Sequence, residues 1–275
     1  MATPRVQNKP LLIATILISL TASLFAEAQL PHGGGAALVT PLEPLRSGVT
    51  AEEVGRELLA HNEQRKKTLA EYASLRTYRV IDLKGKVHAE EIGRMEFRAP
   101  DKKTFVLTSE SGSGLIRHLA LNPLINSEIE TASGKEHHDS AISPENYTLT
   151  LLGEQQVGPY RCFVLQAAPR RNDKYLFEGK LWIDVEDYAV VRIEGHPAKK
   201  LSFWIERADF VRQYQKIGEF WLPQRDETSV QVRLYGNKVL TIDHQDYVVK
   251  GVGLQNKEPS MTDSEARARA ISGLH

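Results

Sequence analysis

YLFEGKLWIDVEDYAVVRIEG (175–195) opens a long segment that continues as FWIERADFVRQYQKIGEFWLPQRDE (203–227) and TSVQVRLYGNKVLTIDHQDYVV (228–249). Short runs of alternating apolar and polar residues are separated by small polar turns throughout this segment. The pattern is typical of antiparallel strands that have one apolar face and one wet face. A large sheet of this kind needs a cover for its apolar face, and the cover is where we look for function.

The same alternation extends the sheet toward the N-terminus. In the segment Glu91–Arg98, Met95 and Phe97 share one face while charged neighbours share the other. Segments that begin at Thr104 and Tyr147 repeat this pattern, so we predict about eleven strands in all. The predicted strands are Thr77–Leu83, Glu91–Arg98, Thr104–Thr108, Tyr147–Leu152, Arg161–Ala167, Tyr175–Asp184, Ala189–Glu194, Ser202–Tyr214, Glu219–Leu222, Ser229–Leu234 and Val239–Val248.

A long helix precedes the strands. Thr50 is followed three residues later by Glu53, which is the spacing of a capping box at a helix N-terminus. We therefore predict a helix from Ala51 to about Tyr72. Its middle is polar all round, so we expect this helix to lie across the surface with its ends buried.

A second helical segment interrupts the strand pattern between residues 109 and 135. It opens with glycines and then places Leu115, Ile116 and Leu119 at helical spacing. Pro123 interrupts the pattern, which predicts two short helices instead of one. A short apolar segment of this kind is a candidate for a lid over the sheet.

The N-terminus has the pattern of an export signal. Basic residues precede the apolar run Leu11–Ala26, and Ala26-Glu27-Ala28 is a small-x-small cleavage site. The run is shorter than the roughly 20 residues that a membrane-spanning helix needs. We expect cleavage of a signal peptide over residues 1–28, with an uncleaved anchor as the alternative.

The rest of the chain reads as one folded domain over residues 50–252. Residues 29–49 are rich in glycine and proline and predict a flexible leader, and residues 253–275 form a polar tail. Cys162 is the single cysteine, so the chain has no internal disulfide. It lies in an apolar strand pattern, where it is expected to be a small buried hydrophobe.

Composition and motifs exclude several classes of function. Lys+Arg and Asp+Glu both number 35 and no long basic tract exists, which is atypical of nucleic-acid-binding proteins. The chain has no G-x-S-x-G elbow, no H-E-x-x-H motif and no glycine-rich phosphate loop. The most site-like cluster, His137-His138-Asp139, lacks a further histidine at metal-ligand spacing. We therefore expect no enzymatic activity, no cofactor and no bound metal.

Three segments together resemble a known family: GKLWIDVEDYAVVRIEGHPAK (179–199), SFWIERADFVRQYQKIGEFWLPQRDE (202–227) and LTIDHQDYVV (240–249). They are similar to outer-membrane lipoprotein-sorting proteins, which belong to the superfamily of LolA-type periplasmic carriers. The resemblance covers roughly residues 50 to 249. It implies a mainly β fold, an unclosed antiparallel β-barrel of about eleven strands with helices that plug its apolar hollow.

The function that follows is a periplasmic carrier or binding protein for lipoprotein acyl chains or other apolar ligands. The alternative is an envelope sensor or accessory domain that binds a membrane protein through the sheet edge or the leader. In the first case the guest lies between the inward face of the sheet and the lid. The predicted hollow is lined by Met95, Phe97, Phe105, Leu107, Tyr147 and Leu149, and the predicted lid residues are Leu115, Ile116 and Leu119.

Overall fold

The computed structural model describes residues 39–45, 48–131, 141–200, 203, 205–234 and 236–251. The predicted signal peptide (1–28), most of the predicted leader, the His137-His138-Asp139 cluster and the polar tail (253–275) lie outside the described residues. Within the described part, none of the helices has the length and apolarity that crossing a membrane requires.

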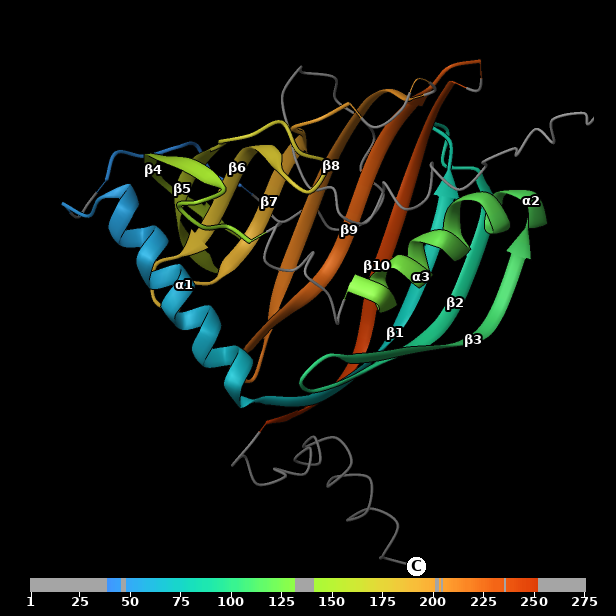
Figure 1. Ribbon diagram of the computed structural model, residues 1–275, viewed down its shortest axis with the longest axis horizontal. Helices are drawn as coiled ribbons and strands as arrows, with labels where there is room; N and C mark the ends of the chain where they lie inside the picture. The colour runs from blue at the N-terminus through green and yellow to red at the C-terminus, as the bar shows by residue number, and fades with distance from the viewer. Residues whose placement is uncertain are drawn as a thin grey trace, which may run out of the picture.

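Ten antiparallel strands form one sheet. They are β1 (Leu69–Ile81), β2 (Val87–Arg98), β3 (Lys102–Gly112), β4 (Tyr147–Val157), β5 (Tyr160–Pro169), β6 (Phe177–Asp184), β7 (Val190–Pro197), β8 (Ile205–Ile217), β9 (Phe220–Val232) and β10 (Gly236–Gly251). Their order is β3-β2-β1-β10-β9-β8-β7-β6-β5-β4, so β3 and β4 are the two edges of an unclosed sheet (Figure 1). The predicted fold class is confirmed.

The sheet has ten strands where the alternation predicted about eleven. The predicted strands Glu219–Leu222 and Ser229–Leu234 are two parts of the single strand β9. The polar residues between them resemble a turn in the sequence, but they are paired on both sides. Arg225 lies opposite Gln213 of β8 and Asp243 of β10, and its side chain is 2.6 Å from the Asp243 carboxylate.

Helix α1 (Ala51–Thr68) begins at the predicted capping box. The backbone N–H of Glu53 donates to the Thr50 hydroxyl at 3.2 Å, and the Thr50 N–H donates to the Glu53 carboxylate at 2.8 Å. The helix is shorter than predicted, because the chain becomes β1 at Leu69 and carries Tyr72 into the sheet.

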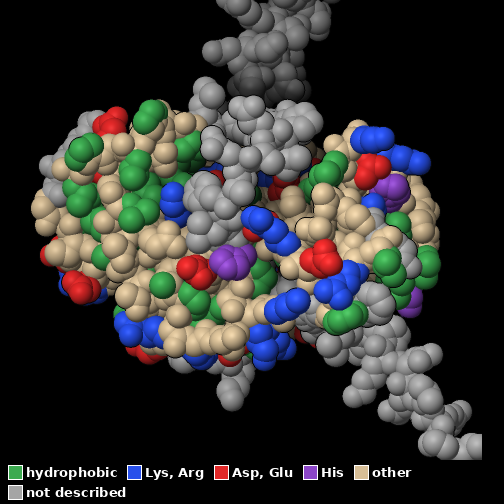
Figure 2. Space-filling view, turned by 90° about the horizontal axis from the view of Figure 1, so that it is seen from above, with side chains coloured by type: hydrophobic (Ala, Val, Ile, Leu, Met, Phe, Trp, Pro, Cys, Tyr) green, Lys and Arg blue, Asp and Glu red, His purple; other side chains and the backbone are tan. Residues whose placement is uncertain are grey.

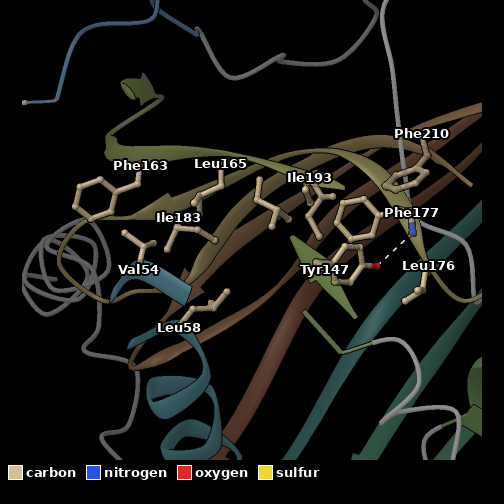
Figure 3. Close-up of a cluster of buried hydrophobic side chains, with 12 residues drawn as sticks. Val54, Leu58, Tyr147, Phe163, Leu165, Leu176, Phe177, Ile183, Ile193 and Phe210 are labelled. Atoms are coloured by element: carbon tan, nitrogen blue, oxygen red, sulfur yellow. Dashed lines mark hydrogen bonds between the residues drawn. The ribbon is translucent and has the colours of Figure 1, made fainter. Parts of the chain in front are cut away.

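α1 covers the end of the sheet formed by β4 to β7 (Figure 1). Val54 and Leu58 are its fully buried side chains, and they point into a cluster that we call the α1 core (Figure 3). The other buried members of the α1 core come from β4 to β8 and the loop before β6: Tyr147, Phe163, Leu165, Ala167, Leu176, Phe177, Leu181, Ile183, Ile193 and Phe210.

A helical segment that we call the lid covers β1, β2 and β3 on the same side of the sheet as α1 (Figure 1). It consists of α2 (Gly114–Ile116), the π-helical turn η1 (Arg117–Leu121) and α3 (Asn122–Thr131), which follow one another directly. The lid is thus continuous where two separate helices were predicted. Pro123 lies in the first turn of α3, where a missing N–H is tolerated.

The lid packs on a second cluster, the lid core. Leu121, Leu124 and Ile125 of the lid are buried, with exposed fractions of 0%, 3% and 4%. They contact the buried members of β1, β2 and β10, which are Tyr78, Val80, Ala89 and Leu240. The α1 core and the lid core are therefore two separate apolar regions on one face of the same sheet.

The opposite face carries a third apolar cluster at β5, β6 and β7. Cys162 is fully buried there beside Val164 and Trp182, which confirms the expected packing role of the single cysteine. Burial, together with the charge of Asp184, raises the pKa of the Cys162 thiol. Large apolar groups therefore lie on both faces of the sheet in this region, with Phe163 in the α1 core and Trp182 in the cluster opposite.

Candidate functional site

Between the α1 core and the lid core lies a cavity of about 230 Å3. Its wall is formed by strands β1, β3, β8, β9 and β10 and by α3. The lining residues are Arg76, Lys103, Leu124, Glu128, Arg212, Tyr214, Pro223, Asp226, Thr228, Leu240, Ile242 and His244. This part of the hollow is mixed in character, with charges of both signs beside aliphatic groups, where the sequence predicted an apolar lining.

Sheet register explains why charged groups meet at this point. Arg76 lies opposite Gly93 of β2 and His244 of β10, on the same face of β1 as Tyr78, because side chains two residues apart share a face. Asp226 lies opposite Ile242 and Arg212, the latter on β8. The alternation therefore directs these polar groups toward the helices together with the apolar ones.

Glu128 of α3 is the anion at the centre of the site. Arg76 Nη1 donates to both of its carboxylate oxygens, at 2.5 and 2.6 Å. Lys103 Nζ donates to Oε1 at 3.2 Å, and the Tyr78 hydroxyl donates to Oε2 at 3.2 Å. Desolvation acts to raise the pKa of Glu128, but the charges of Arg76 and Lys103 outweigh it and hold that pKa far below its ordinary value.

Arg76 is buried, with an exposed fraction of 1%. Burial alone would lower the pKa of its guanidinium, and the Glu128 carboxylate reverses this and raises it. Burial also acts to lower the pKa of Lys103, and the charge of the Glu128 carboxylate outweighs this effect and raises that pKa. Both cations therefore stay charged, and each depends on the carboxylate of the lid for its compensation.

A second charged group lies on β8, β9 and β10. The Asp226 carboxylate accepts from His244 Nε2 at 3.0 Å and lies 3.1 Å from Arg212 Nε. Burial, followed by the charge of Arg76, lowers the pKa of His244, so its ring is neutral at neutral pH. The Asp226 carboxylate is therefore compensated by His244 and Arg212, which both belong to the sheet and not to the lid.

The other end of the lid is also held by charge. Arg117 Nη2 donates to the Glu110 carboxylate of β3 at 2.8 Å, and Arg117 Nη1 donates to the carbonyls of Ser111 and Gly112 at 3.2 and 2.9 Å. Beneath it, the Glu91 side chain is buried, and burial raises the pKa of this carboxyl. Ion pairs thus flank the apolar contact of the lid on both sides.

The structure places the predicted hollow residues on the covered face but in different clusters. Tyr147 and Leu149 belong to the α1 core, whereas Phe105 packs against the lid core. Met95 is fully buried, and Phe97 stacks on Tyr72 of β1, with ring centroids 5.2 Å apart. Leu107 is 46% exposed on the edge strand β3.

The predicted lid residues differ in their packing. Ile116 packs against the lid core, but Leu115 and Leu119 are exposed, at 67% and 41%. The apolar face of the segment runs from Ile116 to Ala120 and Leu121, across the π-helical turn η1, and continues at Leu124 and Ile125.

The sequence reasoning missed Arg76 and Glu128, although each leaves a signal. Arg76 occupies a position of the β1 alternation between Tyr72 and Tyr78, where an apolar residue is expected. Glu128 falls four residues after Leu124, on the apolar side of α3. A charged residue at an apolar position of a strand and another on an apolar helix face would together have indicated a buried ion pair.

The described residues do not form a recognisable metal-binding site. In the part of the chain that the structure describes, no three His, Cys, Asp or Glu side chains group in a way that could hold a metal ion. Figure 2 shows charged side chains of both signs beside one another on the face seen from above, with hydrophobic groups between them. The chemistry that the site offers is ion pairing next to apolar packing.

No family model matches the sequence, and no curated protein matches it. Among solved structures, the chain is similar to a DUF1329 family protein from Desulfovibrio piger, with 13% identity, a TM-score of 0.40, and coverage of 75% of this chain and 95% of that one. A domain of an outer membrane lipoprotein-sorting protein from Vibrio parahaemolyticus has 12% identity, a TM-score of 0.43 and the same coverage.

A LolA superfamily protein from Nitrosomonas europaea has 10% identity and a TM-score of 0.33, over 76% of this chain and 97% of that one. At such low identities and TM-scores, the functional argument rests on the residues of the chain itself.

Proposed function

We propose that this chain is a periplasmic carrier or binding protein that takes an acyl chain or another apolar ligand between the sheet and the lid. The observation that carries the proposal is the separation of the two cores. The lid can leave the lid core without disturbing α1, because α1 packs on β4 to β8. A guest that replaces the lid then meets the apolar groups of Tyr78, Val80 and Leu240.

The free energies of burial allow an acyl chain to replace the lid on the sheet. Burial of Leu121, Leu124 and Ile125 contributes about 1.5–3 kcal/mol each, or roughly 5–9 kcal/mol together. An acyl chain gains about 0.8 kcal/mol for each CH2 that it buries. Roughly six to eleven methylenes therefore match the apolar contact of the lid. The cavity of about 230 Å3 is smaller than the roughly 300–1,000 Å3 of ordinary ligand sites, so the lid must move to admit such a guest.

The test is binding of an uncharged fluorescent acyl probe, together with native mass spectrometry of protein purified from the periplasm. Leu124→Ala removes part of the lid contact, and we expect it to raise probe affinity. Leu115→Ala removes an exposed leucine from the same segment and is the matched control, for which we expect no change. If no lipid copurifies and neither the parent chain nor Leu124→Ala binds the probe, the proposal is wrong.

Export through a cleaved signal peptide is part of this proposal. Fractionation of cells that express the full chain should place the protein in the periplasm, and N-terminal sequencing should begin at Gln29. An intact Met1 on membrane-bound protein would instead support the uncleaved anchor.

A second candidate, an accessory domain that binds an envelope protein, is favoured by the edge strand β3. Val106 and Leu107 on this edge are exposed, at 58% and 46%, and an extended segment of a partner could add to it as a further strand. Crosslinked pull-down from membranes distinguishes the two. One stoichiometric membrane protein without lipid would favour the accessory domain, and loss of that partner in Val106→Pro would locate it on β3.

A further inference from the structure

The contacts of the lid have the layout of an amphiphile. Glu128 supplies an anion, and Leu124 and Leu121 follow on the same side of the helix at intervals of four and three residues. At a rise of about 1.5 Å per residue, these groups extend over about 10 Å. The segment therefore presents to the sheet one carboxylate and a neighbouring apolar stretch, as a fatty acid would.

We propose that the ligand of this site carries an anionic head group, and that Glu128 holds the place of that head group while the lid is closed. The inference rests on the proposed function and names the class of its ligand, an acyl amphiphile with an oxyanion head. The head lies at Arg76, Lys103 and Tyr78 when the lid has left, and the tail lies where Leu124 and Leu121 were.

The first argument is charge compensation. Arg76 is almost completely buried, and the Lys103 side chain is 19% exposed. When Glu128 leaves with the lid, these two cations lose the carboxylate on which they converge, and an uncompensated buried charge is strongly destabilising. An uncharged guest leaves that defect in place, whereas a guest with an oxyanion removes it.

The second argument concerns the part of the cavity wall that the structure describes, in which no other anion is available. Asp226 is the remaining carboxylate of the lining, and it is held by His244 and Arg212. With Glu128 present, the three cations of the lining exceed its anions by one, and without Glu128 they exceed them by two. The open site therefore attracts an anion more strongly than the closed one.

The third argument is the donor geometry. A guanidinium, an ammonium and a phenol hydroxyl reach the two oxygens of one carboxylate, at 2.5 to 3.2 Å. Arginine and lysine recognise carboxylate and phosphate oxygens in this way. Either head group satisfies the donors, and the two are separated by experiment.

The experiment measures displacement of an uncharged acyl probe from the full chain below micelle concentrations. Palmitate and hexadecyl phosphate represent the two head groups, hexadecanol is the uncharged chain, and acetate and inorganic phosphate are heads without a tail. We expect either anionic amphiphile to compete about ten-fold better than hexadecanol. We expect the free anions not to compete at the same concentrations. The stronger of the two amphiphiles identifies the head group.

Variants test the place of Glu128. Glu128→Gln removes the internal anion, so we expect it to strengthen palmitate binding more than hexadecanol binding. Arg117→Gln loosens the other end of the lid without removing an anion, and as the matched control it should strengthen both equally. The double variant Arg76→Met with Glu128→Leu keeps the region apolar, and we expect it to bind hexadecanol and lose its preference for palmitate.

The outcomes separate this inference from the proposed function. Equal competition by palmitate and hexadecanol would overturn the anionic head group and leave the apolar binding site intact. Retention of the palmitate preference in the double variant would overturn the role of Arg76. Failure of every amphiphile to compete, with no probe bound, would contradict the proposed function itself.

Discussion

At the scale of single residues, the pair Arg76–Glu128 stands out because it is buried and yet joins two elements that the proposed function requires to separate. A buried ion pair is weak as a source of stability, since a well-packed apolar pair often does as well or better. Breaking it by removal of one partner is costly. The pair therefore adds little net stability, but removing Glu128 without a replacement is costly. A ligand of the same charge as Glu128 avoids that cost.

We expect Arg76→Met alone to lower the free energy of unfolding by about 3 kcal/mol, because it removes the cation that contacts both oxygens of the buried Glu128 carboxylate. The double variant Arg76→Met with Glu128→Leu should recover most of that loss. Urea unfolding of the parent, the two single variants and the double variant forms the thermodynamic cycle. Additive losses in the double variant would show that the two side chains do not interact energetically.

A pH dependence follows from His244. Burial and the charge of Arg76 lower its pKa in the folded state, whereas the unfolded chain has the ordinary value of about 6.5. The unfolded chain then binds more protons, so stability rises with pH in this window. The contribution is fully present above about pH 6.5 and is lost as the pH falls through the folded-state pKa.

His244→Gln removes this titration. We therefore expect the variant to show a flatter dependence of the unfolding free energy on pH between roughly pH 7 and 5 than the parent chain. Urea unfolding at a series of pH values measures this dependence. The titratable and charged groups that face the His244 ring are Asp226, Arg76, Glu128 and Tyr247. An unchanged slope would assign the titration to other groups.

At the scale of elements, α1 and the lid differ in what holds them. α1 has 18 residues, a complete capping box and two fully buried side chains. α3 has 10 residues, which is short for a helix to be stable alone, where about 12–15 are marginal. The helical form of the lid therefore depends on its contacts with the lid core and on the ion pairs near its two ends.

This difference predicts unequal hydrogen exchange. We expect the backbone amides of α3 to exchange through local opening, faster than those of β5 and β6, which border the α1 core. Addition of the anionic amphiphile that binds should change protection in the lid and leave β5 and β6 unchanged. Measurement by mass spectrometry on peptides resolves the two regions. Equal protection of α3 and β5 would contradict a lid that opens by itself.

At the scale of the whole molecule, the α1 core and the lid core of one curved sheet have different roles. The α1 core binds the long helix to one end and supplies stability, whereas the lid core closes the other end through a smaller contact (Figures 1 and 3). The charged cavity lies between them. A single continuous core would have tied the opening of the lid to the unfolding of the domain.

The division predicts that stability and binding respond to different substitutions. Leu181→Ala in the α1 core should lower the free energy of unfolding by about 2–5 kcal/mol, because the residue is fully buried, and should leave probe affinity unchanged. Leu124→Ala in the lid should lower it less and raise probe affinity. Thermal or urea unfolding and probe titration on the same samples compare the two. Weaker binding in Leu181→Ala would show that the cores are coupled.

Local features of the chain were readable in the sequence because they depend on neighbours along it. The alternation of residues such as Met95 and Phe97 indicated strands and their covered face, and Thr50 with Glu53 indicated the start of α1. The continuity of β9 was not readable, because its polar middle is paired by Gln213 and Asp243 from other strands.

The site itself depends on register and curvature, which no local pattern contains. Arg76 and Glu128 are 52 residues apart in the chain, and they meet because the lid folds back over β1 after two intervening strands. The sequence alone established an antiparallel sheet with a helical cover. The order and register of the strands then divided the hollow into two cores and placed buried charges between them, since contacts between distant segments follow from how the whole sheet assembles.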